Sequence, residues 1–237
     1  ALGGDLPAPT KILILTSGFL RSWYGAPLIV ASIISGMVGI GGDRGGMGGL
    51  IFFIGAVAFS IYYCWKKGRN FLQVADILIP SVALGHFFGR LGCLAAGCCW
   101  GVEVDPSFPL AVQFPDGSLV HSTMERQGVI PHGEAFTPHL HPVQLYESTG
   151  ELGIFFLLLL VRAYKRFHGQ VLLAYLFIYP LLRTNLEFIR GDKARGEYAI
   201  GSLMVSTSQI ISVIIASIAL ILLVVLVRRR SAREAPA

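Results

Sequence analysis

Long, largely apolar stretches alternate with short basic or polar segments along most of this chain. The longest runs from Leu203 to Val227 and ends at three consecutive arginines. Because about 20 apolar residues span the hydrocarbon core of a bilayer, this stretch predicts a transmembrane helix. Four other apolar stretches, three of them with one or two charged residues, predict further spans: Gly48–Trp65, Phe71–Gly89, Val143–Val161 and Gln170–Ile189. With one or two more from Ile12 and from Pro27–Ile40, the pattern predicts about six or seven crossings.

Composition points to an all-α polytopic membrane bundle rather than to a soluble protein. Only 14% of the 237 residues are charged, 54% are hydrophobic, and the mean hydropathy is +0.65. Soluble domains contain about 25% charged residues. We predict a single membrane domain over residues 1–237. Residues 101–140, rich in Pro, Gly and His, are expected to form an irregular external loop, in which Leu110–Phe114 alternates weakly like a strand.

Three basic segments set the expected orientation: residues 66–69, 162–168 and 228–230. If the spans alternate in direction, all three segments lie on one side of the membrane, and the positive-inside rule makes that side cytoplasmic. The C-terminus is then cytoplasmic, and residues 90–101, the loop and residues 190–198 face the other side. The net charge of +5 follows largely from this asymmetry, so it gives no reason to expect a nucleic-acid partner.

Arg90 stands among glycines and small residues at the end of a predicted span. A charge at that depth is costly in lipid, so such a residue usually faces a protected cavity and is a candidate for a functional site. His86, one turn earlier, either lines the same cavity or is a packed, hydrogen-bonded histidine. Asp76, early in the same span, is expected to be a structural partner near the cytoplasmic end.

Two later spans carry polar stripes of their own. In the first, His141, Gln144, Glu147, Ser148 and Glu151 share about a third of the helix circumference, so they should face the bundle interior or a wet cavity. Interhelical hydrogen bonding is as good an explanation as function for Gln144 and Glu147, and the better one for Glu151.

The second stripe consists of Tyr179, Arg183, Glu187 and Arg190 on one narrow face. Arg183 and Glu187 could neutralise each other, but Arg183 also has Arg90 as a possible companion at similar depth. Two arginines that share a cavity repel each other unless an anion lies between them. Phosphate is the natural anion, because its oxygens match the guanidinium fork.

The cysteines allow several interpretations. Cys93, Cys98 and Cys99 lie together, whereas Cys64 is expected to be an ordinary small apolar residue. The spacing lacks the paired C-x2-C pattern of zinc sites, so no metal site is predicted. A disulfide from Cys93 to Cys98 or Cys99 and close packing of small residues are equally plausible. A catalytic thiol ranks third.

Several motifs together resemble bacterial prolipoprotein diacylglyceryl transferases. They are Phe71-Leu-Gln-Val-Ala-Asp76, Gly89-Arg-Leu-Gly92, Cys99-Trp-Gly101, Asp105-Pro-Ser-Phe-Pro109, His141-Pro-Val-Gln-Leu-Tyr-Glu147, Tyr179-x3-Arg183, Glu187-Phe-Ile-Arg190 and Ser208-Gln-Ile. The resemblance covers most of the chain from about Gly45 onward. It implies a seven-helix bundle in the bacterial inner membrane, with a cavity open to the periplasmic leaflet.

The resemblance also implies a reaction, in which a diacylglyceryl group moves from phosphatidylglycerol to the lipobox cysteine of a prolipoprotein and glycerol phosphate leaves. Arg90, Arg183, Tyr179 and His141 are then the candidate catalytic residues. The arginines would hold the phosphate, and the thiol needs a base, for which His86, His141 and Tyr179 are candidates. Candidate substrate-binding residues are Arg190, Gln144, Glu147, His86, Gly89, Gly92 and Gly101. No cofactor is expected, and membrane lipids surround the bundle.

This chain departs from the family pattern at several positions. Cys93 stands where the family has Asn, and Cys98 where it has Glu. Gly45–Gly49 resembles a family loop but lacks its histidine, and Trp23-Tyr24-Gly25 is a poorly placed match to the Tyr-Gly pair of the first helix. Two alternatives to the transferase therefore stay open. One is a catalytically degenerate homologue that serves as a structural or lipid-binding subunit beside other membrane subunits. The other is a small-anion transporter, ranked last because no inverted repeat is visible.

Overall fold

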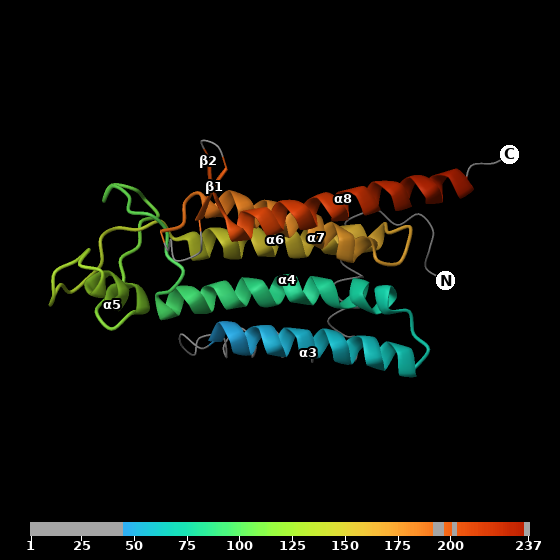
Figure 1. The fold of residues 1–237 in the computed structure, drawn as a ribbon, viewed down its shortest axis with the longest axis horizontal. Coiled ribbons are helices and arrows are strands. Elements are labelled where there is room, and N and C mark those ends of the chain that lie inside the picture. Colours follow the sequence, from blue (N-terminus) through green and yellow to red (C-terminus); the bar gives the residue numbers. More distant parts are fainter. Residues whose placement is uncertain (1–44, 192–196, 201–202, 235–237) are drawn as a thin grey trace.

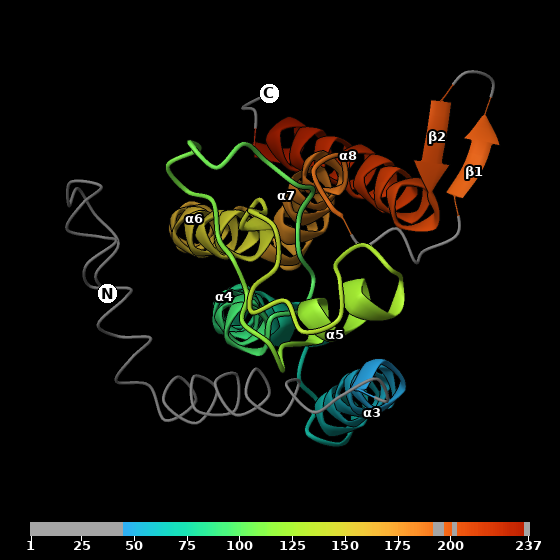
Figure 2. The same cartoon turned by 90° about the vertical axis from the view of Figure 1, so that its left-hand side faces the viewer.

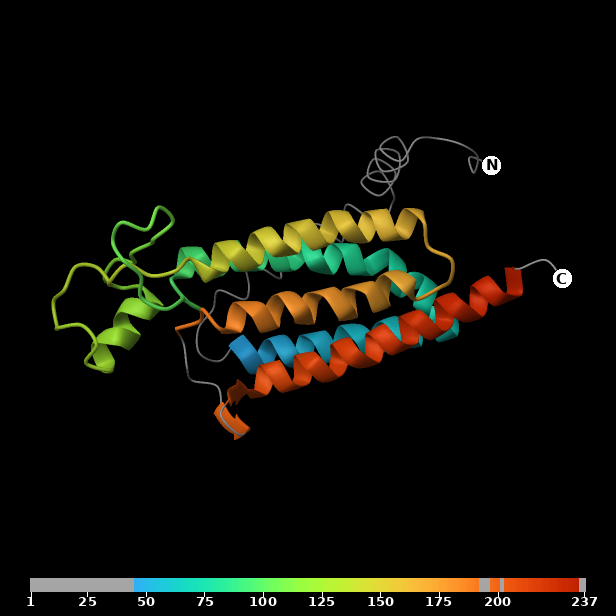
Figure 3. The same ribbon diagram turned by 90° about the horizontal axis from the view of Figure 1, so that it is seen from above.

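The computed structural model describes residues 45–191, 197–200 and 203–234, and most of these residues form a bundle of helices. The long helices run side by side along one axis (Figures 1 and 3): α3 (Gly45–Lys66), α4 (Phe71–Ala96), α6 (Val143–Ala163), α7 (Gln170–Glu187) and α8 (Thr207–Glu234). The short helix α5 (Leu119–Arg126) and the hairpin of β1 (Glu197–Ile200) and β2 (Leu203–Ser206) lie at one end. We call this the loop end.

By length and composition, α4, α6 and the Thr207–Arg230 part of α8 are helices that could cross a membrane. Helix α8 exposes large apolar side chains along its length, including Ile214, Ile218 and Ile221, which suits contact with lipid. The predicted spans from Ile12 and from Pro27–Ile40 lie outside the described residues. The described part therefore supports a multi-pass helical protein without fixing the number of crossings.

Helix α4 is longer than the sequence pattern predicted. Its N-terminus is capped by the Asn70 side chain, which accepts hydrogen bonds from the amides of Leu72 and Gln73. Its C-terminus is closed by Gly97, whose left-handed backbone (φ 62°) suits glycine. The predicted span ended at Gly89, whereas the helix continues to Ala96. Arg90 therefore lies within the helix, close to its C-terminal end.

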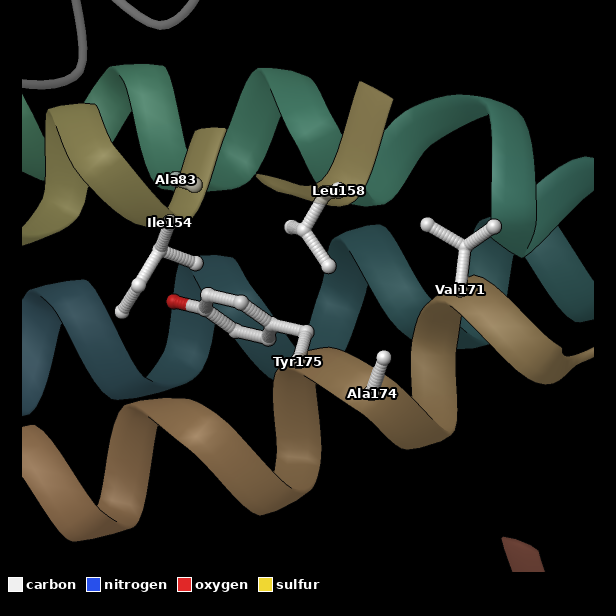
Figure 4. Close-up of a cluster of buried hydrophobic side chains, with 6 residues drawn as sticks. All are labelled: Ala83, Ile154, Leu158, Val171, Ala174 and Tyr175. Carbon is white, nitrogen blue, oxygen red and sulfur yellow. The ribbon is translucent and has the colours of Figure 1, made fainter. Parts of the chain in front are cut away.

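Helices α4, α6 and α7 pack around a common apolar core, with α8 against α7 and α3 on the outer side of α4 (Figure 2). Figure 4 shows the centre of this core, formed by Ala83, Ile154, Leu158, Val171, Ala174 and Tyr175. Ala83 is fully buried, and its small side chain allows α4 and α6 to approach closely. This contact sets the spacing of the two helices that carry Arg90 and Glu147.

Asp76 fixes the opposite end of the core, as the sequence predicted. Its buried carboxylate accepts hydrogen bonds from the amides of Gly169 (2.9 Å), Val171 (3.0 Å) and Leu172 (3.2 Å) at the start of α7. It also forms an ion pair with Lys165 at 3.0 Å. A negative charge at a helix N-terminus satisfies amides that have no partner within the helix, so Asp76 ties α7 to α4.

Residues 101–140 are more ordered than the predicted irregular loop. They contain α5, which begins after the capping residue Ser118, and a small core of Phe114, Val120, Met124, Ile130 and Leu140. Leu110–Phe114 forms no strand; Val112 makes only an isolated bridge to Leu140. The prediction missed α5 because its apolar face is only two turns long.

The segment before α8 also differs from the prediction. Leu203–Ser206 was expected to begin the last span, but it pairs with Glu197–Ile200 as an antiparallel hairpin. The helix begins at Thr207 instead. The β-branched and apolar residues of this segment suit both a strand and a helix, so only the pairing with Glu197–Ile200 decides between them.

The three basic segments lie at the same end of the bundle, as the sequence predicted. The α3–α4 turn, the α6–α7 loop and the end of α8 are all at the end opposite α5 (Figure 1). Arg90, the start of α6 and the end of α7 lie toward the loop end. Arg90, Glu147 and Arg190 thus lie toward the end of the bundle opposite the basic segments.

Candidate active site

Two arginines from different elements converge on one buried carboxylate. The Arg90 guanidinium of α4 lies 2.8 Å from Glu147 of α6, and that of Arg190, just after α7, lies 3.9 Å from the other oxygen of the same carboxylate. We call these three residues the arginine–glutamate cluster. The side chains of Glu147 and Arg190 are only 2% and 3% exposed, whereas that of Arg90 is 22% exposed. Arg90 is therefore the member that an incoming ligand can reach.

The backbone beside this cluster is held by close contacts. The Gln144 side-chain amide donates a 2.7 Å hydrogen bond to the carbonyl of Cys98. Gly101 packs so tightly on His141 that an added Cβ would lie 2.6 Å from the His141 Cβ and carbonyl oxygen. Gly101 also bridges to Arg190. Gln144 and Gly101, both predicted to bind substrate, thus join the segment after α4 to α6 and to Arg190. Gly89 and Gly92 are half-buried on α4 beside Arg90.

A second polar group lies deeper along the bundle. The His86 Nδ1 is 3.1 Å from the Glu151 carboxylate and 2.8 Å from the Tyr175 hydroxyl. The His86 ring centroid lies 5.3 Å from that of Tyr179, which stacks on Tyr175 at 5.5 Å. The side chain of His86 is 45% exposed, so it is hydrogen-bonded but not enclosed. Glu151 is fully buried and bonded to His86, which agrees with its expected structural role.

Tyr175 was missed by sequence reasoning. It lies four residues before Tyr179 and therefore on the same helix face, so its position was a readable signal. A tyrosine within an apolar run is usually an ordinary side chain of the hydrophobic core, so Tyr175 was not singled out from the sequence. Its hydroxyl bond to His86 gives this side chain a partner that only the packing of α4 on α7 reveals.

Arg183 has a carboxylate of its own. It forms an ion pair with Glu187 one turn later, and the Ser208 hydroxyl of α8 donates a 3.0 Å hydrogen bond to Glu187. The possible i,i+4 pair of Arg183 and Glu187 is thus present. The arginine that shares a carboxylate with Arg90 is Arg190 rather than Arg183. Tyr179 is within electrostatic range of both Arg90 and Arg183.

His141 lies at the start of α6, against the loop segment. Its Nδ1 is 3.2 Å from the Tyr146 hydroxyl, and its ring packs edge-on to Phe108 at 5.0 Å. Its backbone amide donates to Val102, and its carbonyl accepts from Gly101. These contacts orient the ring. The predicted catalytic role of His141 stays a prediction.

The three clustered cysteines lie beside the arginines. The Sγ atoms of Cys93, Cys98 and Cys99 are all within 4.8 Å of one another, and all three residues are half-buried free cysteines. Cys99 has a positive φ of 60°, which L-residues rarely adopt. Hydrogen bonds from the Cys93 and Cys98 thiols lower the pKa of the Cys99 thiol, and the positive charges of Arg190 and Arg90 lower it further.

Comparisons with known proteins indicate the family of this chain. The sequence profile of a family described as prolipoprotein diacylglyceryl transferase matches residues 24–225. Two clostridial relatives carry the name phosphatidylglycerol–prolipoprotein diacylglyceryl transferase. The protein from Clostridium tetani is 37% identical over 156 residues (65% of this chain, 54% of the relative), and one from Clostridium perfringens is 34% identical over 159 residues (67% and 54%).

A protein of the same name from Burkholderia cenocepacia is 32% identical over 202 residues, which cover 79% of this chain and 67% of the relative. The chain spans about half the length of the two clostridial relatives. The profile match includes every helix that contributes to the arginine–glutamate cluster. This chain belongs to the prolipoprotein diacylglyceryl transferase family.

Proposed function

We propose that this protein transfers a diacylglyceryl group from phosphatidylglycerol to the thiol of a prolipoprotein lipobox cysteine. The observation that carries the proposal is the convergence of Arg90 and Arg190 on Glu147. Two positive charges and one negative charge leave a net charge of +1 in a largely buried place. A phosphodiester carries one negative charge, so a lipid headgroup phosphate complements the cluster. The names of the relatives supply the two substrates.

The cluster also suits the change of charge during the reaction. Attack of the thiol sulfur on the glyceryl carbon forms a C–S bond and breaks the C–O bond to phosphate. The leaving group becomes a glycerol phosphate, whose charge grows as the bond breaks. Arginines held by Glu147 therefore interact more strongly with the transition state than with the bound lipid, which is the condition for catalysis. Arg90, as the more exposed arginine, makes the first contact.

The remaining predicted residues have supporting roles in this proposal. Tyr179 lies within electrostatic range of Arg90 and Arg183, which supports a role for Tyr179 and Arg183 in contacting the headgroup alongside Arg90. The acceptor thiol must lose its proton, and His86, His141 and Tyr179 are the proposed bases. The side chain of His86 is exposed, whereas its hydrogen-bonding partners Glu151 and Tyr175 are buried.

The orientation is part of the proposal. Because the basic segments lie at the end opposite the arginine–glutamate cluster, the positive-inside rule places the loop end in the periplasm and the C-terminus in the cytoplasm. The protein is then a multi-pass component of the bacterial inner membrane. Residues 1–237 form one membrane domain, with residues 101–140 as its external segment at the loop end.

A transfer assay tests the proposal. The purified protein is incubated with phosphatidylglycerol and a lipobox peptide, and mass spectrometry measures addition of the diacylglyceryl group. Arg90→Ala and Arg190→Ala should each reduce the rate by at least about a hundredfold, the usual cost of removing one charge-stabilising donor. Arg69→Ala is the matched control, because Arg69 is exposed at the opposite end of the bundle.

A Ser-for-Cys peptide must remain unmodified. If the protein binds phosphatidylglycerol but never alkylates the Cys peptide, the lipid-binding-subunit hypothesis replaces the transferase.

A further inference from the structure

Three half-buried thiols lie next to Arg90, and none of them has a role in the proposed reaction as described above. Their sulfur atoms all lie within 4.8 Å of one another. A tetrahedral zinc site has Zn–S bonds of about 2.3 Å, which places its sulfurs about 3.8 Å apart. The Sγ atoms of Cys93, Cys98 and Cys99, which lie within 4.8 Å of one another, would have to approach by about 1 Å or less to reach that spacing around one ion.

A disulfide explains this arrangement less well. It would use two of the three thiols and leave the third without a role. Adjacent Cα atoms are about 3.8 Å apart, below the usual range for bridged cysteines, so a bond between Cys98 and Cys99 is disfavoured. A metal ion uses all three sulfurs at once.

The backbone that carries the thiols is fixed in place. The Cys98 amide donates to the Cys93 carbonyl at 3.0 Å, and the Cys98 carbonyl accepts from Gln144. The Gly97 carbonyl accepts a 2.8 Å bond from the Val120 amide, which ties the turn to α5. Cys99 keeps its unfavourable positive φ within this turn. Strained positions retained by surrounding contacts cluster at functional sites.

The charges around the cluster suit an ion with thiolate ligands. Three thiolates and one divalent cation carry a net charge of −1. Arg190 and Arg90 both interact electrostatically with Cys99, so the metal site and the phosphate would share the positive charge of these arginines. Thiolate ligands select thiophilic ions such as zinc over magnesium or calcium.

We propose that Cys93, Cys98 and Cys99 bind a thiophilic metal ion of the zinc class, whose open fourth position takes the thiol of the acceptor cysteine. In the described residues the group of possible ligands consists of these three thiols alone. Structural zinc sites have four protein ligands, whereas catalytic sites have three and leave one position open. The binding of the acceptor thiol at the fourth position rests on the proposed transferase function, whereas metal binding by the three cysteines does not.

The open position solves a requirement of the reaction. A free thiol is mostly protonated at neutral pH, and the thiolate is the nucleophile. On binding the ion, the acceptor thiol gives its proton to solvent or to a nearby base. Its sulfur then attacks the glyceryl carbon, and the electron pair of the broken C–O bond leaves with the glycerol phosphate. Arg90 links the two sites, since it interacts with both Cys99 and Glu147.

Metal binding is tested without lipid or peptide. The reduced, metal-free protein is titrated with Co²⁺, whose thiolate complexes absorb in the near ultraviolet. One Co²⁺ per chain should bind with this absorption and be displaced by Zn²⁺. Cys93→Ser, Cys98→Ser and Cys99→Ser should each weaken binding by at least about tenfold. Cys64→Ser is the matched control, because Cys64 is buried at the far end of α3.

Circular dichroism establishes that each serine variant is folded, and the wild-type titration does not depend on the variants. The proposal is overturned if Co²⁺ produces no near-ultraviolet thiolate absorption in the wild type. It is also overturned if the variant with all three cysteines replaced by serine keeps this absorption. Loss of two thiols by thiol counting in the unreduced protein also overturns it, because it indicates a disulfide.

The open position is tested by adding the lipobox peptide to the Co²⁺ protein. The Cys peptide should shift the ligand-field bands, and the Ser peptide should leave them unchanged; equal spectra with both peptides overturn the role of the fourth position. These readouts do not require transfer. Intact Co²⁺ binding with a failed transfer assay therefore counts against the transferase function and not against the metal site.

Discussion

At the scale of single residues, the decisive feature is that the Glu147 carboxylate forms ion pairs with two arginines, Arg90 and Arg190. Arg190 and Glu147 are buried, so solvent screens the attraction between their opposite charges only weakly. The sequence identified both arginines and Glu147 as candidates. It could not identify their pairing, because three residues far apart in the chain meet only through the packing of α4, α6 and the end of α7. It favoured Arg183 as the companion of Arg90, whereas Arg183 is bound to Glu187.

Glu147→Gln tests this shared contact. The change leaves two arginines facing each other without a counter-charge, so the free energy of unfolding should fall by about 3 kcal/mol or more. Thermal unfolding in detergent measures the loss. Phosphatidylglycerol should stabilise Glu147→Gln more than the wild type, because its phosphate replaces the missing charge. The exposed Glu103→Gln is the control. Equal lipid stabilisation of both proteins would argue against a phosphate between the arginines.

Gly101 offers a second test at this scale. A Cβ at Gly101 would overlap His141 backbone and side-chain atoms, so Gly101→Ala must push the segment after α4 away from α6. We expect transfer to fall by about tenfold or more, since misplacement of about 1 Å is costly in an active site. Gly153→Ala is the matched control, because nothing lies within 4 Å of its added Cβ. Unchanged activity in Gly101→Ala would show that this close contact does not position the site.

At the scale of elements, the largely apolar runs predicted α3, α4, α6 and α7 within a few residues at most ends. These boundaries were accessible because basic turns, Asn70 and Gly169 interrupt the apolar pattern. The hairpin and α5 could not be predicted from the sequence, since each is short and depends on contacts with other segments. The extension of α4 past Gly89 was hidden by glycines that a membrane helix tolerates. That extension is what places Arg90 opposite Glu147.

The anchor at the other end of α7 gives a prediction at this scale. Asp76→Ala removes a buried acceptor and leaves the amides of Gly169, Val171 and Leu172 without their partner. The free energy of unfolding should fall by about 3–5 kcal/mol. Lys165→Ala, which removes only the partly exposed ion pair, should cost about 1 kcal/mol or less. Thermal unfolding of both variants checks the ranking, and similar losses would contradict it.

At the scale of the whole molecule, the described helices separate two chemically different ends. One end carries the basic turns and the other carries the arginine–glutamate cluster, the thiols and residues 101–140 (Figure 1). The sequence predicted this polarity because alternating spans place every second connection on one side. It could not predict that residues 101–140 form a small core of their own, because that core joins residues from several turns.

The orientation can be measured with engineered cysteines. Lys67→Cys and Ser107→Cys place exposed thiols at opposite ends of the bundle. In intact cells, a membrane-impermeant maleimide should label Ser107→Cys above the unmodified protein and should label Lys67→Cys only after the membrane is opened. The reverse pattern would place the arginine–glutamate cluster on the cytoplasmic side.

The shared carboxylate also bears on turnover. A pair of arginines strong enough to grip a doubly charged glycerol phosphate would tend to retain it after the reaction. Glu147 is an anion that never departs, and it competes for both guanidinium groups as soon as the leaving product loosens. In the proposed reaction, Glu147 would thereby return both arginines to the resting arrangement seen in the structure.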